Sequence, residues 1–313
     1  MEHLTTLVSS RGLLKSCNAY NIRPRSSVDS VDSSLLDSHG PGGSIYVCTD
    51  ALARFSSEVL PKISSPFVLV TGDSDTPIDD ELLNSAPARA LLESSFLIEW
   101  FAQNLATQNE VLRAIPIGQD YHTVWERPGI WGLGPSSPIA QEHLLIETFR
   151  QAPDIKNRYP RAYCNWHFEL NRGDRRECLS RAEQQACFYE PARLPRQASW
   201  ARQAEFMFVL SPSGVGFDCH RTWEALSLGC IPIVKKNRIS KLFEGLPVIL
   251  VDDWCEVTAT NLQRFYDELC QKKFDMSSLF LTHWVQKFRN NNRRLLPPMT
   301  MSTFQRLITH SSK

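Results

Sequence analysis

The stretch of sequence with the most chemically useful residues spans positions 206–234 and reads FMFVLSPSGVGFDCHRTWEALSLGCIPIV. Its first five residues are apolar and predict a buried strand over 206–210. The loop that follows begins at Ser211 and carries Gly214 and Gly216, which can take a positive φ and let backbone approach a ligand. Free N–H groups and the helix dipole meet where such a loop enters a helix, so the pattern is typical of a phosphate site.

The helix after this loop is expected over 220–228, with Asp218 as its N-cap, and it carries charges at helical spacing. Arg221 and Glu224 share one face, and His220 lies one turn before Glu224. A cation near the helix start would neutralise a diphosphate, and a carboxylate one turn further suits the two hydroxyls of a ribose. The alternative is a solvated ion pair on a helix that follows an ordinary turn.

The string SPSGVGFDCHRTWEALSLGCIPIV resembles the donor-site motif of the exostosin-like glycosyltransferases, the group of the exostosins and the plant xyloglucan galactosyltransferase type enzymes. In that motif a Pro-Gly loop leads to a helix that reads roughly R-x-x-E-A-L-x-x-G-C-I-P-V. Matched residue by residue, Glu224 falls on the acidic residue that holds the ribose and Arg221 on a phosphate-side position. The turn at 229–232 falls behind the sugar nucleotide. The amino-terminal half carries no comparable motif.

The resemblance implies a GT-B fold, in which two Rossmann-like domains with parallel sheets face a cleft and the carboxyl-terminal domain binds the nucleotide sugar. It implies an inverting glycosyltransferase, with UDP-sugars favoured as donors and a hydroxyl of a glycan or other molecule as acceptor. Such enzymes generally need no metal or other cofactor. This is physically reasonable because a helix N-terminus and arginines can stabilise the leaving diphosphate.

Arginines gather after another candidate strand, 162–166, in the run HFELNRGDRRECLSR. Arg172 and Arg175 come closest to the strand end. Because the carboxyl ends of parallel strands meet at one edge of a sheet, these side chains are expected to face the same cleft and to clamp a diphosphate. The alternative is the basic surface of an ordinary helix.

Two loops of the amino-terminal half carry candidates for the general base that deprotonates the acceptor hydroxyl. The strand PFVLVTGDSD ends in Asp73 and Asp75, and the segment IPIGQDYHT presents Asp120 and His122. We rank these candidates Asp75, Asp73, His122 and Asp120. A D-x-D after a strand also matches a Mn²⁺ or Mg²⁺ site, so a metal-dependent transferase that uses Asp73 and Asp75 is an alternative. A noncatalytic nucleotide-binding module is another.

Short apolar runs that alternate with helical stretches must position these residues. Strands are predicted at 44–48, 66–71, 111–117, 162–166, 186–190, 206–210, 230–234 and 246–251, and helices at 139–151, 175–186, 219–228, 256–271 and 278–291. The stretch 88–105 is helical or mixed. Continuous apolar strands alternating with helices predict an α/β protein with parallel sheets covered on both faces.

The densest run of Pro, Gly and Ser outside the chain start lies at 126–138 and predicts the boundary between two domains. Residues 1–43 form a Ser-rich segment that is expected to be irregular or peripheral. We assign an amino-terminal acceptor domain to 44–130 and a nucleotide-sugar-binding domain to 139–280. A final segment, 281–313, is expected to pack back toward the first domain.

The whole-chain composition narrows the class of partner. Among 313 residues, 34 Lys and Arg balance 34 Asp and Glu, so no overall positive field favours nucleic acid. No run of about 18 apolar residues predicts a membrane span, and the first thirty residues lack a signal-peptide pattern, so a cytoplasmic location is expected. The nine cysteines are scattered without a CxxC pair, which predicts neither a disulfide framework nor a structural zinc site.

Overall fold

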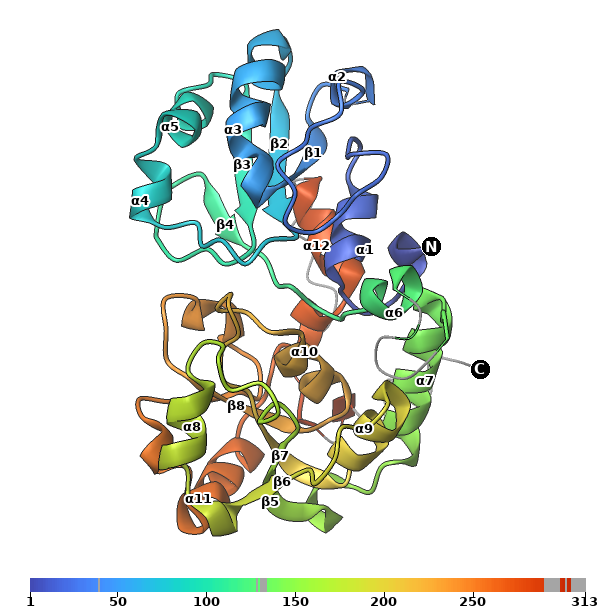
Figure 1. Cartoon of the computed structure of the whole chain (residues 1–313), viewed down its shortest axis with the longest axis vertical. Coiled ribbons are helices and arrows are strands. Elements are labelled where there is room, and N and C mark those ends of the chain that lie inside the picture. The colour runs from blue at the N-terminus through green and yellow to red at the C-terminus, as the bar shows by residue number, and fades with distance from the viewer. Residues whose placement is uncertain (39, 128, 130–133, 290–298, 302, 305–313) are drawn as a thin grey trace.

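The computed structural model describes residues 1–38, 40–127, 129, 134–289, 299–301 and 303–304, and two parallel β-sheets form its framework (Figure 1). The first sheet has the order β1-β2-β3-β4, with strands Gly43–Cys48, Phe67–Gly72, Leu97–Ala102 and Leu112–Ala114. The second has the order β6-β5-β7-β8-β9, where β5 to β9 are Tyr159–Cys164, Cys187–Tyr189, Phe206–Leu210, Ile231–Lys235 and Ile249–Val251. The predicted α/β class with two parallel sheets is therefore confirmed.

Helices connect these strands. The α-helices are α1 Ser10–Ser16, α2 Leu35–Ser38, α3 Leu52–Arg54, α4 Asp80–Leu83, α5 Ala86–Leu92, α6 His122–Glu126, α7 Pro138–Gln151, α8 Arg175–Arg181, α9 Arg196–Gln203, α10 His220–Ser227, α11 Ala259–Cys270 and α12 Leu281–Phe288. Shorter turns are η1 Glu2–Leu4, η2 Thr49–Ala51, η3 Phe55–Val59, η4 Leu60–Lys62, η6 Ile155–Asn157, η7 Gln184–Ala186, η8 Ser240–Phe243, η9 Trp254–Glu256 and η10 Met276–Leu279.

Side chains of the first sheet alternate between two buried faces, which explains its unbroken apolar strands. Leu69 and Trp100 belong to a core with the helical stretch η2 to η4 and α5, whereas Val70 and Phe101 point into a core with α1 and α12. The ring of Phe288 in α12 lies 4.9 Å from that of Phe101. The same core continues into the second half of the chain.

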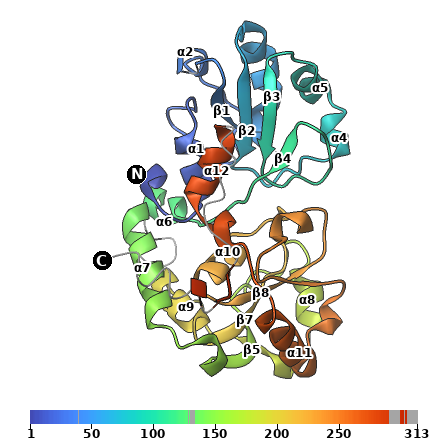
Figure 2. The same ribbon diagram turned by 180° about the vertical axis from the view of Figure 1, so that it is seen from behind.

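The amino-terminal segment is not peripheral, and this expectation is wrong for its first twenty residues. Ser9 caps α1 by accepting a hydrogen bond from Gly12 N–H, and Leu13 and Leu14 are buried. Views from both sides show α1 beside α12 (Figure 2). The buried polar residues Ser10 and Arg11 on this helix hide the apolar pattern that would have predicted it.

Most predicted elements are present, with shifted ends. The stretch 88–105 divides into the end of α5 and strand β3, and the helix predicted at 175–186 stops at Arg181 because Ala182 is extended. Helix α9 was not predicted because its buried face carries Arg196 and Gln203 beside Trp200. Parts of the boundary at 126–138 and of the segment 281–313 lie outside the described residues. No helix in the described part of the chain is long and apolar enough to cross a bilayer.

Candidate functional site

A cleft of about 890 Å³ lies between the two halves of the chain and is lined by residues of both. Loops at the carboxyl ends of β2, β5, β6 and β7 contribute to it, as expected for parallel sheets. Eleven of the twelve predicted site residues line this cleft, namely Asp73, Asp75, Asp120, His122, Arg172, Arg175, Gly214, Gly216, His220, Arg221 and Glu224. The twelfth, Ser211, is buried behind it, with its Oγ 2.8 Å from Thr222 Oγ1.

The glycine loop works through close packing rather than through unusual backbone angles. Gly214 and Gly216 do not have a positive φ, so this expectation is wrong. A Cβ on Gly216 would lie 2.9 Å from both Asn104 Nδ2 and Asp75 Oδ1, which belong to the other half. Gly173 has φ +51, and a Cβ there would lie 2.4 Å from the carbonyl oxygens of Ser213 and Gly214. Gly216 therefore allows close approach to loops of the first half, and Gly173 allows close approach of its own loop to the glycine loop.

Helix α10 starts at the cleft, but its N-cap differs from the prediction. The cap residue is Cys219, whereas Asp218 accepts hydrogen bonds from Ile117 N–H at 2.7 Å and Trp223 Nε1 at 2.9 Å. Burial raises the pKa of Asp218 to about 6, although these two hydrogen bonds act in the opposite direction. Asp218 thus joins α10 to the first half of the chain, and the first N–H groups of the helix receive no side-chain cap. Gly229 ends the helical segment with φ +69, as expected.

Positive charge gathers beside the start of α10. Arg221 donates a hydrogen bond to the carbonyl oxygen of Pro212 at 3.0 Å. Its positive charge also acts on the nearby guanidinium of Arg175. Burial, followed by the charge of Arg221, lowers the pKa of Arg175 to about 10. Arg172 is more exposed and pairs with Glu169 at 3.4 Å. An anion of more than one charge would relieve the repulsion between these cations.

Asp174 fixes the geometry of this cationic region. One carboxylate oxygen accepts hydrogen bonds from the backbone N–H and hydroxyl of Ser213, at 2.7 and 2.8 Å. The other accepts from Trp254 Nε1 at 2.8 Å. The arginine-rich loop and the glycine loop are therefore held together, although their sequences lie about forty residues apart.

Glu224 lies on α10 behind the cationic region. Its side chain is 15% exposed, and Oε1 is 4.0 Å from Nη2 of Arg196. The same Arg196 nitrogen lies 3.0 Å from Asp120 Oδ2. Arg196, which the sequence analysis did not single out, therefore connects the carboxylate of one half with a candidate residue of the other.

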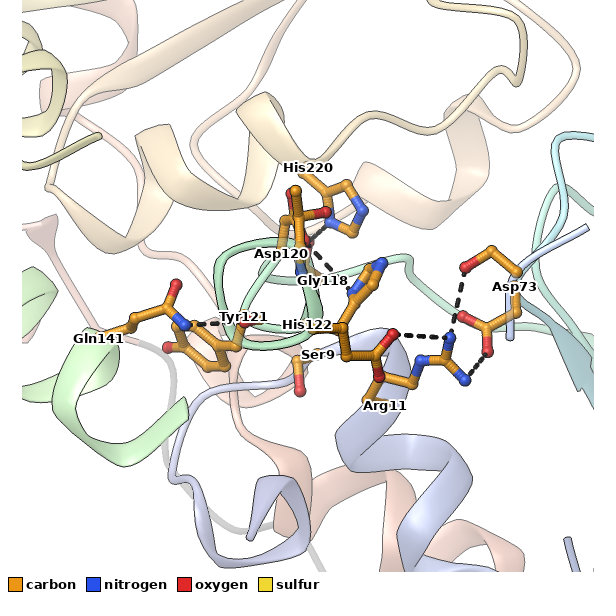
Figure 3. A network of polar contacts seen from close by, with 12 residues as sticks. Ser9, Arg11, Asp73, Gly118, Asp120, Tyr121, His122, Gln141 and His220 are labelled. Carbon is orange, nitrogen blue, oxygen red and sulfur yellow. Dashed lines mark hydrogen bonds and ion pairs between the residues drawn. The ribbon is translucent and has the colours of Figure 1, made fainter. Parts of the chain in front are cut away.

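Asp120 and His122 form a pair at the cleft, with Asp120 Oδ1 3.3 Å from His122 Nδ1 (Figure 3). Burial alone would raise the pKa of Asp120, but the charges of His122, Arg196 and His220 hold that pKa well below its usual range. Burial is also the largest influence on His122 and lowers its pKa, against the opposing effect of Asp120. The pair is therefore an ionised carboxylate beside a neutral imidazole at neutral pH.

The two acids of the D-x-D motif have different surroundings. The carboxylate of Asp73 is buried and lies 2.9 Å from Arg11 Nη1 (Figure 3). Arg11 is itself buried and also lies 3.7 Å from Glu126. Asp75 is exposed beside Gly216. The carboxylates of Asp73 and Asp75 therefore do not share one environment, and the described residues contain no group of three metal-ligating side chains.

Comparisons with known proteins find only distant similarity. No family model matches the sequence, and no curated protein matches it. Solved structures that align with it include a trehalose-6-phosphate synthase (11% identity, 82% of this chain and 72% of that chain, TM-score 0.42) and one from E. coli bound with UDP-2-fluoro glucose (11%, 82% and 74%, TM-score 0.40). A UDP-forming α,α-trehalose-phosphate synthase from Burkholderia vietnamiensis aligns at 10% identity (85% and 73%, TM-score 0.39).

Proposed function

We propose that this chain is a glycosyltransferase that moves a sugar from a nucleoside-diphosphate sugar to an acceptor hydroxyl. One observation carries the proposal. A single cleft brings the start of α10 and Glu224 together with the Asp120–His122 pair of the other half. The exostosin-like motif at 211–234 supports membership of that group of enzymes.

In this proposal the second half of the chain would bind the donor. Free N–H groups at the start of α10 and the cations Arg221, Arg175 and Arg172 would hold the diphosphate. Glu224 would accept hydrogen bonds from the ribose hydroxyls, one turn further along the helix. Asp174 acts indirectly, because it holds the arginine-rich loop and the glycine loop together.

His122 is the best candidate for the general base, ahead of Asp75, Asp73 and Asp120. With Nδ1 facing Asp120, Nε2 is the nitrogen that would take the acceptor proton. The acceptor oxygen would attack the anomeric carbon, the bond from that carbon to the diphosphate would break, and the diphosphate would leave toward Arg221. We propose that the reaction inverts the anomeric centre, as the sequence resemblance implies. Asp73 and Asp120 are less suitable because each is already paired with an arginine.

The same geometry disfavours the metal-dependent alternative. The guanidinium of Arg11 lies where a divalent cation would approach Asp73, and two cations would repel each other there. The cationic side chains around α10 supply positive charge for the leaving group instead. We therefore propose a reaction that needs no metal.

Incubation with a panel of nucleoside-diphosphate sugars, with and without glycan acceptors, tests the proposal. We expect free nucleoside diphosphate to appear with at least one donor, at the same rate with and without a chelator. Binding of a nucleoside diphosphate without release from any donor would instead indicate a noncatalytic module. Complete loss of release on chelation would indicate the metal-dependent reaction.

Replacement of Glu224 by glutamine tests the donor site separately. We expect the affinity for a nucleoside diphosphate to fall by about 10- to 100-fold, because one charged acceptor of the ribose hydroxyls is lost. Isothermal titration calorimetry measures this change. Glu147→Gln, on the exposed face of α7, is the matched control and should bind like the wild type. Equal affinity of the Glu224 variant and the wild type would exclude the ribose contact.

A further inference from the structure

One end of the cleft has a composition that the phosphate and ribose contacts do not explain. It lies at the carboxyl ends of β5 and β6, where the lining includes aromatic side chains and one carboxylate, Glu190. The aromatic lining residues are Tyr163, Trp166, Phe168 and Trp200. Tyr163, Trp166 and Trp200 are at most 4% exposed, so among these rings the partly exposed Phe168 is the one on which a planar ring could stack.

This end of the cleft lies next to the proposed position of the ribose. Glu224 lies 4.0 Å from Arg196, and the guanidinium of Arg196 lies over the ring of Trp200, 5.4 Å from its centroid. On the next turn of α9, Ser199 accepts a hydrogen bond from Asn165 at 3.0 Å. A nucleotide with its ribose on Glu224 and its phosphates on α10 would extend its base toward this region.

Glu190 is an unusual residue to find there. It is 3% exposed, and its Oε2 accepts no hydrogen bond from the part of the chain that the structure describes. The nearest cation, Arg202, has its Nε 3.6 Å from that oxygen and is largely on the surface. The side chain of Tyr163 also interacts with this carboxylate, but Oε2 receives no hydrogen bond. A buried carboxylate oxygen without a donor is costly, and a ligand with N–H groups would remove that cost.

We propose that this end binds the nucleobase and that Glu190 selects guanine. The inference rests on the proposed function. Guanine carries two neighbouring donors, N1–H and N2–H, which match the two oxygens of one carboxylate. Uracil offers a single N–H between two carbonyl oxygens, and these would be repelled by Glu190. Adenine and cytosine place one amino group beside an acceptor nitrogen. The donor would then be a GDP-sugar, not the UDP-sugar that the sequence resemblance favours.

Calorimetric titration of the full chain with GDP, UDP, ADP and CDP tests this inference. We expect GDP to bind about tenfold or more tightly than the other three, because a paired carboxylate-to-base contact discriminates on this scale. Glu190→Gln should lower the affinity for GDP by about tenfold or more and change that for UDP by less than about threefold. If the glutamine variant does not fold, Glu190→Asp is the substitute, because its shorter side chain moves the carboxylate away from the base. It should also weaken the binding of GDP more than that of UDP.

Arg202→Gln is the matched control, because it removes the cation near Glu190 and keeps the carboxylate. It should retain the preference for GDP. Tighter binding of UDP, ADP or CDP, or an unchanged preference in Glu190→Gln, would overturn the guanine assignment and leave the proposed function intact. An equal loss in Arg202→Gln would also overturn it, since Glu190 would then act through the ion pair. Failure of all four nucleotides to bind would overturn the proposed function itself.

Discussion

Replacement of His122 by alanine is expected to lower kcat for sugar transfer by about 10²- to 10⁴-fold, the usual contribution of a positioned general base. The affinity for the nucleoside diphosphate should change little, because His122 is proposed to contact the acceptor and not the diphosphate, although its ring lies 6.0 Å from that of His220 at the start of α10. Steady-state rates together with calorimetric titration separate these two quantities. The control is His143→Ala on the exposed face of α7, which should transfer sugar at the wild-type rate.

The pH profile provides a second readout for the same residue. Burial lowers the pKa of His122 below its usual value, and only the neutral imidazole can accept a proton. The rate of the wild type should therefore be constant near neutral pH and fall as the pH drops through that lowered pKa. In His122→Ala this acid limb should disappear. A variant that keeps both its rate and its acid limb would assign the base elsewhere, with Asp75 the next candidate.

Replacement of Arg221 by alanine is the second change with a large expected effect. We expect kcat to fall by about 10²- to 10³-fold, because the variant loses a fixed positive charge next to the leaving diphosphate. Arg221→Lys should recover part of the rate, since it restores the charge without the planar fork. Rates of nucleoside-diphosphate release with a saturating donor measure the effect.

Arg176→Ala is the matched control for this series. Arg176 belongs to the same arginine-rich segment, but it contacts Asn171 and does not line the cleft. Its replacement should leave the rate unchanged. If Arg221→Ala and Arg176→Ala lowered the rate equally, general positive charge rather than a fixed contact would be responsible. An unaffected Arg221→Ala would exclude Arg221 from the leaving-group site.

The parts of the molecule that sequence reasoning predicted correctly have local signals. Strands β2 and β7 are buried on both faces, so each reads as an unbroken apolar run. The glycine loop, Arg221 and Glu224 lie within one short segment. The spacing of Arg221 and Glu224 along the helix is sufficient to place their side chains on one face. This explains why Gly214, Gly216, His220, Arg221 and Glu224 fall together in the cleft.

The parts that were missed depend on contacts between distant segments. Arg196 meets Asp120 across 76 residues, and Asp174 meets Ser213 across 39. The first pair joins the two halves of the chain and the second joins two loops of the second half, so local spacing predicts neither. Arg11 was missed for a related reason, because a buried arginine on α1 reads as a polar surface residue until its partner Asp73 is placed beside it. The glycine angles were also predicted wrongly, since neither Gly214 nor Gly216 has a positive φ and only Gly216 is required by close contacts.

The most direct test of the central claim is a crystal structure of this chain with a bound nucleoside diphosphate. We predict that the phosphates will contact the first N–H groups of α10 and the guanidinium of Arg221, with the ribose hydroxyls on the carboxylate of Glu224. A nucleotide bound outside the cleft, or inside it with the ribose turned away from Glu224, would contradict this account.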